Sequence, residues 1–249
     1  MDAGKQIIAV IPARGGSKRV PRKNLLALRG KPLIAHTIDH AKRSRLVNRI
    51  IVSTDDNEIS DVAIKHGAEV IKRPPELSGD TASSEVALLH VVEWLAEKEK
   101  YAPDILVFLQ CTSPIRNESD IDNAIGVFLE HHADSLFSAC RFKKYIWQVR
   151  NGEVSPINYD YRRRWREQDF PHQVLENGSI FVLKTSILKE RGNRLGGKIV
   201  VYEMDELSSI QVDSEEDFML CNCIMEMREK GAVTILSKQD QRRKKHPSS

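Results

Sequence analysis

The sequence predicts an α/β fold, in which a Rossmann-like, mostly parallel sheet is flanked by helices and carries an inserted arm. Short apolar runs alternate along the chain with longer segments whose apolar residues recur at helical spacing. This alternation is typical of a parallel sheet with right-handed crossovers. It is interrupted at about residues 141–175 by aromatic and cationic residues, which indicate the arm.

The first predicted strand is Ile7–Ile11, a branched apolar run typical of a strand buried on both faces. The loop behind it contains Gly15-Gly16 and is rich in cations: Arg14, Lys18, Arg19, Arg22 and Lys23. Flexible backbone N–H groups and cations after a first strand suit a polyphosphate. A solvated basic turn explains the charge as well, and the loop matches neither G-x-x-x-x-G-K-[ST] nor G-x-G-x-x-G.

The following elements continue the β-α order. Apolar residues at helical spacing predict the helices, short branched runs predict the strands, and turn residues or prolines end them. The predicted elements are a helix at Pro32–Arg43, a strand at Ile50–Thr54, a helix at Asn57–His66 and a strand at Glu69–Lys72.

A long helix is predicted from about Ser83 to Lys100, because Leu88, Val92 and Leu95 belong to a wide apolar stripe. The polar segment before it, residues 73–84, ends in good capping residues. We leave two interpretations of this segment open: a capped loop, or a pocket for a base and its ribose.

The strongly apolar run Ile105–Gln110 predicts a strand near the middle of the sheet, followed by a helix from Ser119 to about His131 and a strand at Ser135–Ala139. The polar segments 12–24, 53–56, 73–84 and 110–116 all follow predicted strands. Because the carboxyl ends of parallel strands meet at one edge, we expect these four segments to form one ligand site.

The predicted arm contains Asn151-Gly152, a hairpin turn signal, among aromatic residues and arginines. This composition is typical of an interface rather than of a floppy surface excursion.

The remaining predicted elements are a strand at Ser179–Leu183, a helix from Thr185 to about Glu190, a strand at Lys198–Glu203, an edge or late strand at Ser209–Asp213 and a last helix opened by Ser214 and Asp217.

Bulk composition favours one large domain, residues 1–236, followed by a basic disordered tail, residues 237–249. The tail carries a charge of +4, so the rest of the chain sums to −1 and gives no support for nucleic-acid binding. A nuclear import signal in the tail stays a weaker alternative.

We expect no membrane association and a cytoplasmic location, because no apolar run approaches a membrane span and no secretory signal opens the chain. The cysteines lack zinc-site spacing and are expected to be buried or free thiols.

Five stretches follow one another along the chain: Ala13-Arg14-Gly15-Gly16-Ser17-Lys18 with Lys23-Asn24, Ile51-Val52-Ser53-Thr54-Asp55, Arg73-Pro74 with Asp80-Thr81-Ala82-Ser83-Ser84, Leu109-Gln110-Cys111-Thr112-Ser113-Pro114-Ile115-Arg116, and Glu176-Asn177-Gly178-Ser179-Ile180. In this order they resemble the motifs of the CMP-sialic acid synthetases, cytidylyltransferases that activate nonulosonic acids with CTP. The resemblance covers the chain from Ile8 to about Met227 and implies a nucleotidyltransferase-type sheet.

The resemblance implies a nucleotide site for CTP. In this family the loop after the first strand holds the triphosphate, and the third motif forms the cytidine pocket. The implied nucleotide-binding residues are Arg14, Ser17, Lys18, Lys23, Asn24, Arg73, Ala82 and Ser84, and the implied catalytic residues are Arg14, Lys18, Lys23, Gln110 and Asp213. Gln110 resembles the glutamine that faces the sugar, and it can orient a substrate but cannot act as a base. The residues do not identify the base.

The resemblance also implies a metal ion and a partner subunit. Asp213 resembles the magnesium aspartate, although the family usually has two aspartates at i and i+2 and this chain has Gln211 at the first position. The arm resembles an insert that forms a homodimer and reaches into the partner's active site. The implied sugar-binding residues are Gln110, Lys144, Arg166 and Phe181, of which Phe181 stands where the family has tyrosine.

These features predict a nucleotidyltransferase of the N-acylneuraminate cytidylyltransferase type, which joins CTP to a nonulosonic acid and releases pyrophosphate. Departures on the sugar side, such as Leu175 and Phe181, leave the acid open between N-acetylneuraminate, a deaminated (KDN-type) analogue and a legionaminate-like acid. A Kdo-type cytidylyltransferase, another sugar-nucleotide pyrophosphorylase and a catalytically silent nucleotide-binding homologue are the alternatives. Gln211 is the one feature that favours the silent homologue.

Overall fold

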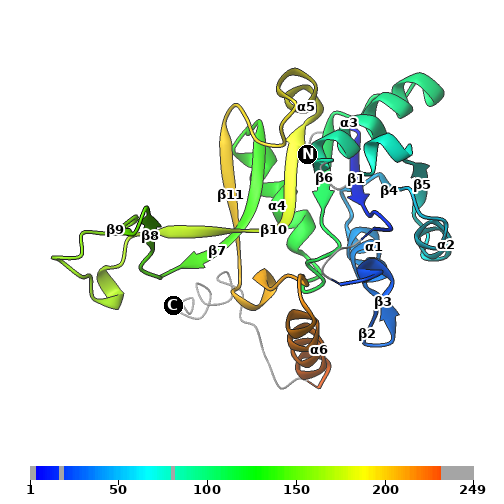
Figure 1. The fold of residues 1–249 in the computed structure, drawn as a ribbon. Helices are drawn as coiled ribbons and strands as arrows, with labels where there is room; N and C mark the ends of the chain where they lie inside the picture. The colour runs from blue at the N-terminus through cyan, green and yellow to red at the C-terminus, as the bar shows by residue number, and fades with distance from the viewer. Residues whose placement is uncertain (1–3, 17–19, 80–81, 231–249) are drawn as a thin grey trace, which may run out of the picture.

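A seven-stranded sheet organises the protein, as a computed structural model that describes residues 4–16, 20–79 and 82–230 shows (Figure 1). The strand order is β11-β7-β10-β6-β1-β4-β5. All neighbouring pairs are parallel except those of β10, which runs antiparallel to both β6 and β7. The strands are β1 (Ile7–Pro12), β4 (Arg49–Thr54), β5 (Glu69–Lys72), β6 (Ile105–Leu109), β7 (Ser135–Phe142), β10 (Gln173–Lys184) and β11 (Ile199–Met204). The predicted mostly parallel α/β sheet is therefore confirmed.

Helices cover both faces of this sheet, because successive residues of the central strands point to opposite sides. Ala9 and Ile11 of β1 pack with α1 (Leu33–Arg43), α2 (Asn57–Lys65) and α4 (Asp120–Glu130). Ile8 and Val10 of β1 pack on the other face with α3 (Ser84–Trp94) and α5 (Thr185–Arg191). Residues Ile8 to Ile11 are fully buried, as the unbroken apolar run predicts.

The last helix, α6 (Glu215–Glu229), packs on a third, smaller cluster beside the ends of the strands. This cluster includes Leu28 of β2 (Ala27–Leu28), which pairs with β3 (Lys31–Pro32), and Val212 from the segment before α6. Ser214 and Asp217 form a capping box at the start of α6, which confirms the predicted helix start.

The predicted strand at Ser209–Asp213 is wrong. The chain forms a short 3-10 helix at Leu207–Ser209 and then an irregular segment that leads into α6. The N–H of Val212 donates to the carbonyl of Thr112 at 2.7 Å, so this segment attaches to the loop after β6. The alternation of polar and apolar residues in this segment arises because Val212 is buried against the loop after β6, and it does not mark a strand at the edge of the sheet.

The arm is an extension of β7 and β10 beyond the body of the sheet (Figure 1). β10 has twelve residues, more than the predicted Ser179–Leu183, because its first half pairs with the end of β7 inside the arm. The predicted hairpin is present as β8 (Trp147–Arg150) and β9 (Glu153–Pro156). Asn151 and Gly152 connect them with φ of 51° and 83°, the left-handed pair that a tight hairpin turn requires.

The described residues contain all four cysteines of the chain. Cys111, Cys140 and Cys221 are buried free thiols and Cys223 is an exposed one, as expected. Among the helices of these residues none has both the length and the apolar character needed to cross a membrane. The predicted basic tail, residues 237–249, lies outside the described residues.

Candidate active site

A cavity of about 510 Å³ lies where the carboxyl ends of β1 and β6 meet the first turn of α3. Its volume is within the range of small-molecule sites. The lining includes every residue of the expected nucleotide, catalytic and metal set that the structure describes: Arg14, Lys23, Asn24, Arg73, Ala82, Ser84, Gln110 and Asp213. Ser17 and Lys18, the other two members, lie outside the described residues. Three of the four expected polar segments, 12–24, 73–84 and 110–116, thus meet at one cavity together with Asp213. Residues 53–56 do not line it.

The loop after β1 is held against the loop after β4. The N–H of Ala13 donates to the carbonyl of Ser53 at 2.9 Å, and the N–H of Gly15 donates to Asp55 Oδ1 at 3.1 Å. A Cβ on Gly15 would lie 2.6 Å from Asp56 Oδ2, so only glycine fits this close approach. The close packing fixes the start of the cation-rich loop at the rim of the cavity.

Lys23 connects this loop to the segment before α6. Its Nζ donates to Asp213 Oδ1 at 3.0 Å and to the carbonyl of Val212 at 2.8 Å. The carboxylate of Asp217 in turn accepts from the N–H of Asp213 at 3.0 Å, which fixes the backbone at Asp213. Asn24 Nδ2 donates to the carbonyl of Arg14 at 3.1 Å and holds the loop in shape. One ammonium and one carboxylate therefore face the cavity side by side.

Arg73 forms the opposite wall, beside the start of α3. Its side chain is buried and donates from Nε to Ser53 Oγ at 3.2 Å and from Nη2 to the carbonyl of Ser53 at 2.7 Å. Burial lowers the pKa of Arg73, and Asp55 partly offsets that effect. Ser83, which also lines the cavity, caps α3 through its contact with the N–H of Val86 at 3.4 Å. This wall presents hydroxyl and backbone groups beside a fixed cation.

Arg116 is a residue that the motif contained but to which sequence reasoning gave no role. It is buried and donates through Nη2 to the carbonyls of Gln110 and Ser179, both at 2.8 Å, and through Nη1 to Thr37 Oγ1 at 3.2 Å. Burial lowers the pKa of Arg116 to about 10. It ties the loop after β6 to β10 and so positions Gln110. An arginine inside a polar segment at the ligand edge was the signal that could have found it.

The side chains of Gln211 and Gln110 both lie against Gly178, within the irregular part of β10 between Glu176 and Phe181. Its side-chain amide donates to the carbonyl of Asn177. Gly178 has a φ of +62°, and a Cβ there would lie 3.1 Å from Gln110 Oε1. The buried Asn177 accepts from Ser138 Oγ at 2.6 Å, which ties this irregular part of β10 to β7. Gln211 therefore acts as a hydrogen-bond donor to the backbone of β10 in this arrangement.

The expected sugar residues other than Gln110 are not at this cavity. Lys144 lines a separate cavity of about 760 Å³ at the base of the arm. Arg166 also lies on the arm, where its Nε is 2.6 Å from Asp169 Oδ2. Phe181 is fully buried and stacks on Phe108 with ring centroids 5.4 Å apart. The register of β10 against β6 pairs Phe181 with Phe108, so both rings lie on the same face of the sheet. Phe108 lines the cavity and Phe181 does not.

Asp213 is the one residue of the expected set that offers a carboxylate to Mg²⁺. Asp213 is half exposed at the cavity, and the described residues contain no cluster of three or more acidic, histidine or cysteine side chains that could hold a metal alone. Mg²⁺ is commonly held by one or two carboxylates together with substrate phosphates and water. Asp213, a single carboxylate on the lining of the cavity, fits such an ion. Gln211 donates to the carbonyl of Asn177 and adds no carboxylate.

Comparison with known proteins gives consistent results. Residues 8–214 match the family model described as cytidylyltransferase. The chain is 35% identical over 218 residues to N-acylneuraminate cytidylyltransferase A of Danio rerio, a match that covers 86% of this chain and 49% of that protein. It is 31% identical to the post-translational flagellin modification protein B of Campylobacter coli, with 86% of this chain and 93% of that protein covered. The chain thus spans about half the length of some relatives and nearly all of another.

Solved structures show the same fold at low identity. A CMP:2-keto-3-deoxy-manno-octonic acid synthetase in complex with CTP is similar with a TM-score of 0.70 at 19% identity, covering 90% of this chain and 100% of that one. A 4-diphosphocytidyl-2C-methyl-D-erythritol synthase is similar with a TM-score of 0.67 at 14% identity, covering 90% of this chain and 100% of that one. At these identities the likeness concerns the fold alone.

Proposed function

The chain belongs to the cytidylyltransferase family, and we propose that it joins the cytidylyl group of CTP to a nonulosonic (sialic-type) acid, giving the CMP-sugar and pyrophosphate. The observation that carries this proposal is the gathering of the expected nucleotide residues around one cavity at the carboxyl edge of the sheet. The relatives named N-acylneuraminate cytidylyltransferase support the choice of acceptor.

The triphosphate of CTP lies, in this proposal, against the loop after β1. Arg14 and Lys23 line the cavity and neutralise phosphate charge, and Ser17 and Lys18 are assigned to the same loop from the sequence. Asn24 maintains the loop through the carbonyl of Arg14. Arg73, Ala82 and Ser84 form the cytidine side, where backbone and hydroxyl groups can bind the edge of the base. Preorganised cations of this kind act where charge develops in the transition state.

The reaction is an in-line displacement at the α-phosphorus. The anomeric hydroxyl oxygen of the sugar acid forms the new P–O bond, the bond to the β-phosphate oxygen breaks, and its electron pair leaves with pyrophosphate. The hydroxyl proton passes to solvent, since the residues identify no base. Gln110, held in place by Arg116, orients the acceptor. Such a reaction depends mainly on alignment and charge neutralisation, which these residues supply.

We propose Mg²⁺ as the cofactor, with Asp213 as the residue that would hold it. When bound, the ion would neutralise phosphate charge and lower the pKa of the attacking hydroxyl. Lys23 keeps the Asp213 carboxylate at the cavity, with its Nζ 3.0 Å from Oδ1. A metal held by one carboxylate would depend on the phosphates of CTP for most of its ligands.

We further propose that the protein acts as a homodimer in which the arm of one subunit supplies Lys144 and Arg166 to the sugar side of its partner's site. The arm has exposed apolar side chains, among them Trp147 and Val149, which a partner surface would bury. Lys144 and Arg166 lie away from the cavity of their own chain, which is compatible with their binding the sugar acid in the site of another copy. A cytoplasmic location stays a prediction.

The test is pyrophosphate release from CTP and Mg²⁺ with a panel of acids: N-acetylneuraminate, its deaminated analogue, a legionaminate-type acid and Kdo. Release with a nonulosonic acid, lost in Asp213→Ala and retained in the control Asp61→Ala, would support the proposal. Asp61 is an exposed aspartate of α2. CTP binding without pyrophosphate release in the presence of any acid would favour the silent homologue. Pyrophosphate release with Kdo alone would identify Kdo, not a sialic-type acid, as the acceptor.

A further inference from the structure

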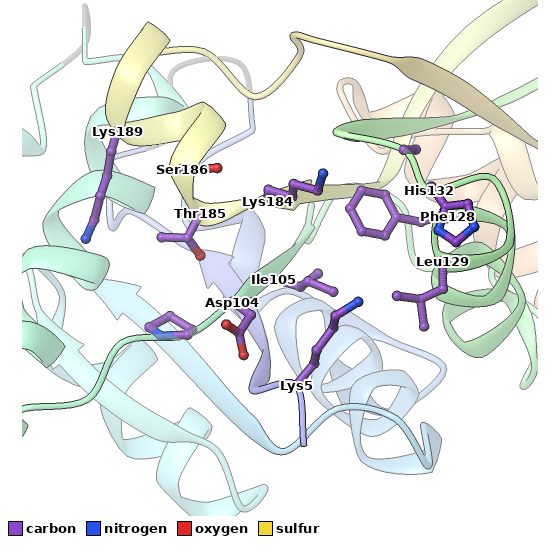
Figure 2. A pocket seen from close by; sticks show the side chains of 12 residues that line it. Lys5, Asp104, Ile105, Phe128, Leu129, His132, Lys184, Thr185, Ser186 and Lys189 are labelled. Carbon is purple, nitrogen blue, oxygen red and sulfur yellow. The ribbon is translucent and has the colours of Figure 1, made fainter. Parts of the chain in front are cut away.

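A second cavity lies at the opposite edge of the sheet from the proposed CTP site. It holds about 490 Å³ and forms where β6 begins at Ile105, β10 ends at Lys184 and α5 begins at Thr185 (Figure 2). β6 has five residues, so about 17 Å of extended strand separates this cavity from Gln110. The two cavities are therefore distinct, and nothing in the proposed reaction uses the second one.

The lining of this cavity combines an apolar side with several basic side chains. Ile105, Phe128 and Ala133 are at most 2% exposed and supply core surface. Figure 2 shows Phe128 and Ile105 facing the same space as the side chain of Thr185. The basic residues of the lining are Lys5, His132, Lys184 and Lys189, against Asp104 as the one carboxylate among the described lining residues.

Two of these charged side chains already interact with other residues of the protein. Lys184 Nζ lies 2.6 Å from Asp134 Oδ1, and the carboxylate of Asp104 accepts from the N–H of Gln6 at 2.7 Å. Lys189 belongs to α5, four residues after Thr185, so both side chains lie on the same face of the helix. The lining therefore keeps a net positive charge, and Lys189 of α5 places part of it next to the apolar residues.

Thr185 has a buried hydroxyl that lacks a partner. The residue is 7% exposed, and Oγ1 is buried and makes no hydrogen bond to any described residue. Nearly all buried polar atoms in folded proteins have a partner, so such an orphan indicates a missing one. The surrounding backbone is already fixed, because the N–H of Thr185 donates to the carbonyl of Asp104 and that of Lys184 to the carbonyl of Asp134, both at 3.0 Å.

We propose that this cavity binds a small organic anion. The apolar body of the ligand packs against Ile105 and Phe128, and its oxyanion head accepts a hydrogen bond from the Thr185 hydroxyl and pairs with Lys189. Lys5 adds positive charge from the other side of the opening. The head is a carboxylate or a phosphate, since both offer acceptor oxygens with negative charge. A ring of benzene size fits a cavity of this volume.

The test is calorimetric titration of the full chain with benzoate, phenyl phosphate and inorganic phosphate, each with and without saturating CTP. We expect saturable binding of at least one aryl anion, tighter than that of inorganic phosphate and unchanged by CTP. The better aryl probe identifies the head group. Displacement by CTP would place the probe in the nucleotide cavity and overturn the proposal, as would the absence of saturable binding.

Two variants and one control make the assignment specific. Thr185→Val keeps the shape of the side chain and removes the hydroxyl, and Lys189→Gln removes the charge on the same face. Each should weaken binding of the aryl anion by about tenfold. Lys65→Gln, at an exposed lysine of α2, should leave binding unchanged. Undiminished affinity in both cavity variants would overturn the proposal, and CTP titrations of the same variants establish that the fold is intact.

Discussion

Lys23 Nζ and Asp213 Oδ1 lie 3.0 Å apart, although 190 residues separate them in the chain. The pair joins the loop after the first strand to the segment that leads into the last helix. Both residues line the same cavity. The proposed phosphate-binding cation and the proposed metal-binding carboxylate are therefore held beside each other before any substrate arrives.

Replacing Lys23 by methionine should lower kcat/KM for CTP by about a hundredfold, because one preorganised charge on the phosphates is lost. The measurement is steady-state pyrophosphate release, with Lys65→Met, a change at an exposed lysine of α2, as the matched control. If Lys23→Met retained the parent rate, the assignment of this lysine to the triphosphate would be wrong.

Replacing Arg116 by methionine should destabilise the fold by about 3 kcal/mol, because the buried carbonyl of Ser179 loses this donor and the part-buried carbonyl of Gln110 keeps only the N–H of Ser113. Urea unfolding monitored by circular dichroism measures this loss. The control is Arg45→Met, at a side chain that is 91% exposed. Equal midpoints for the two variants would contradict the positioning role of Arg116.

Gln211→Asp separates two effects that the structure places on one side chain. The change removes the amide that donates to the carbonyl of Asn177, so the free energy of unfolding should fall by about 1–3 kcal/mol. It also adds a carboxylate two residues before Asp213, so half-saturation with Mg²⁺ should occur at a lower concentration. Magnesium titrations of the initial rate, together with urea unfolding, report the two effects separately. An unchanged magnesium requirement would show that position 211 does not face the metal.

Histidine burial predicts a loss of stability in mild acid. Burial lowers the pKa of His40 well below its usual value, with Arg116 and Arg43 acting in the same direction, and its Nδ1 has no partner among the described residues. In the unfolded chain His40 takes up a proton near pH 6.5, whereas in the folded chain it stays neutral to lower pH. The free energy of unfolding should therefore fall as the pH drops below 6.5. The slope is at most about 1.4 kcal/mol per pH unit for one group.

Unfolding of the parent, His40→Leu and the exposed-site control His131→Leu at pH 7.5 and pH 5.5 checks this prediction. His40→Leu should lose less stability between the two pH values than the parent, because its core position no longer titrates. His131→Leu should behave as the parent does, since His131 is exposed. The same acid sensitivity in all three proteins would assign the effect to other groups.

Much of the fold could be predicted because it depends on local pattern. The apolar run at Ile7–Ile11, the Asn151-Gly152 turn and the capping box of Ser214 and Asp217 each act within a few residues. The polar segments after the strands could be assigned to one edge, because parallel strands share an edge whatever their order. Eight of the expected site residues accordingly line one cavity.

Other features depended on packing between distant segments. The segment at Ser209–Asp213 alternates in polarity as a strand does, yet it attaches to the loop after β6 through Val212. Phe181 follows a binding motif, yet the register of β10 against β6 turns it into the core beside Phe108. Neither outcome is encoded in the residues next to these positions.

By itself, the sequence determined the order of the strands and helices of the seven-stranded sheet and the edge that carries the site, since periodicity and turn chemistry are local properties. The residues expected to meet there followed from the resemblance of the five motifs to a known family. Only the tertiary structure decided that β10 runs against its neighbours, that Arg116 holds Gln110, and that Lys23 meets Asp213. These relationships join segments far apart in the chain. They arise only when the sheet and its helices are packed, because burial and hydrogen-bond satisfaction then select one arrangement.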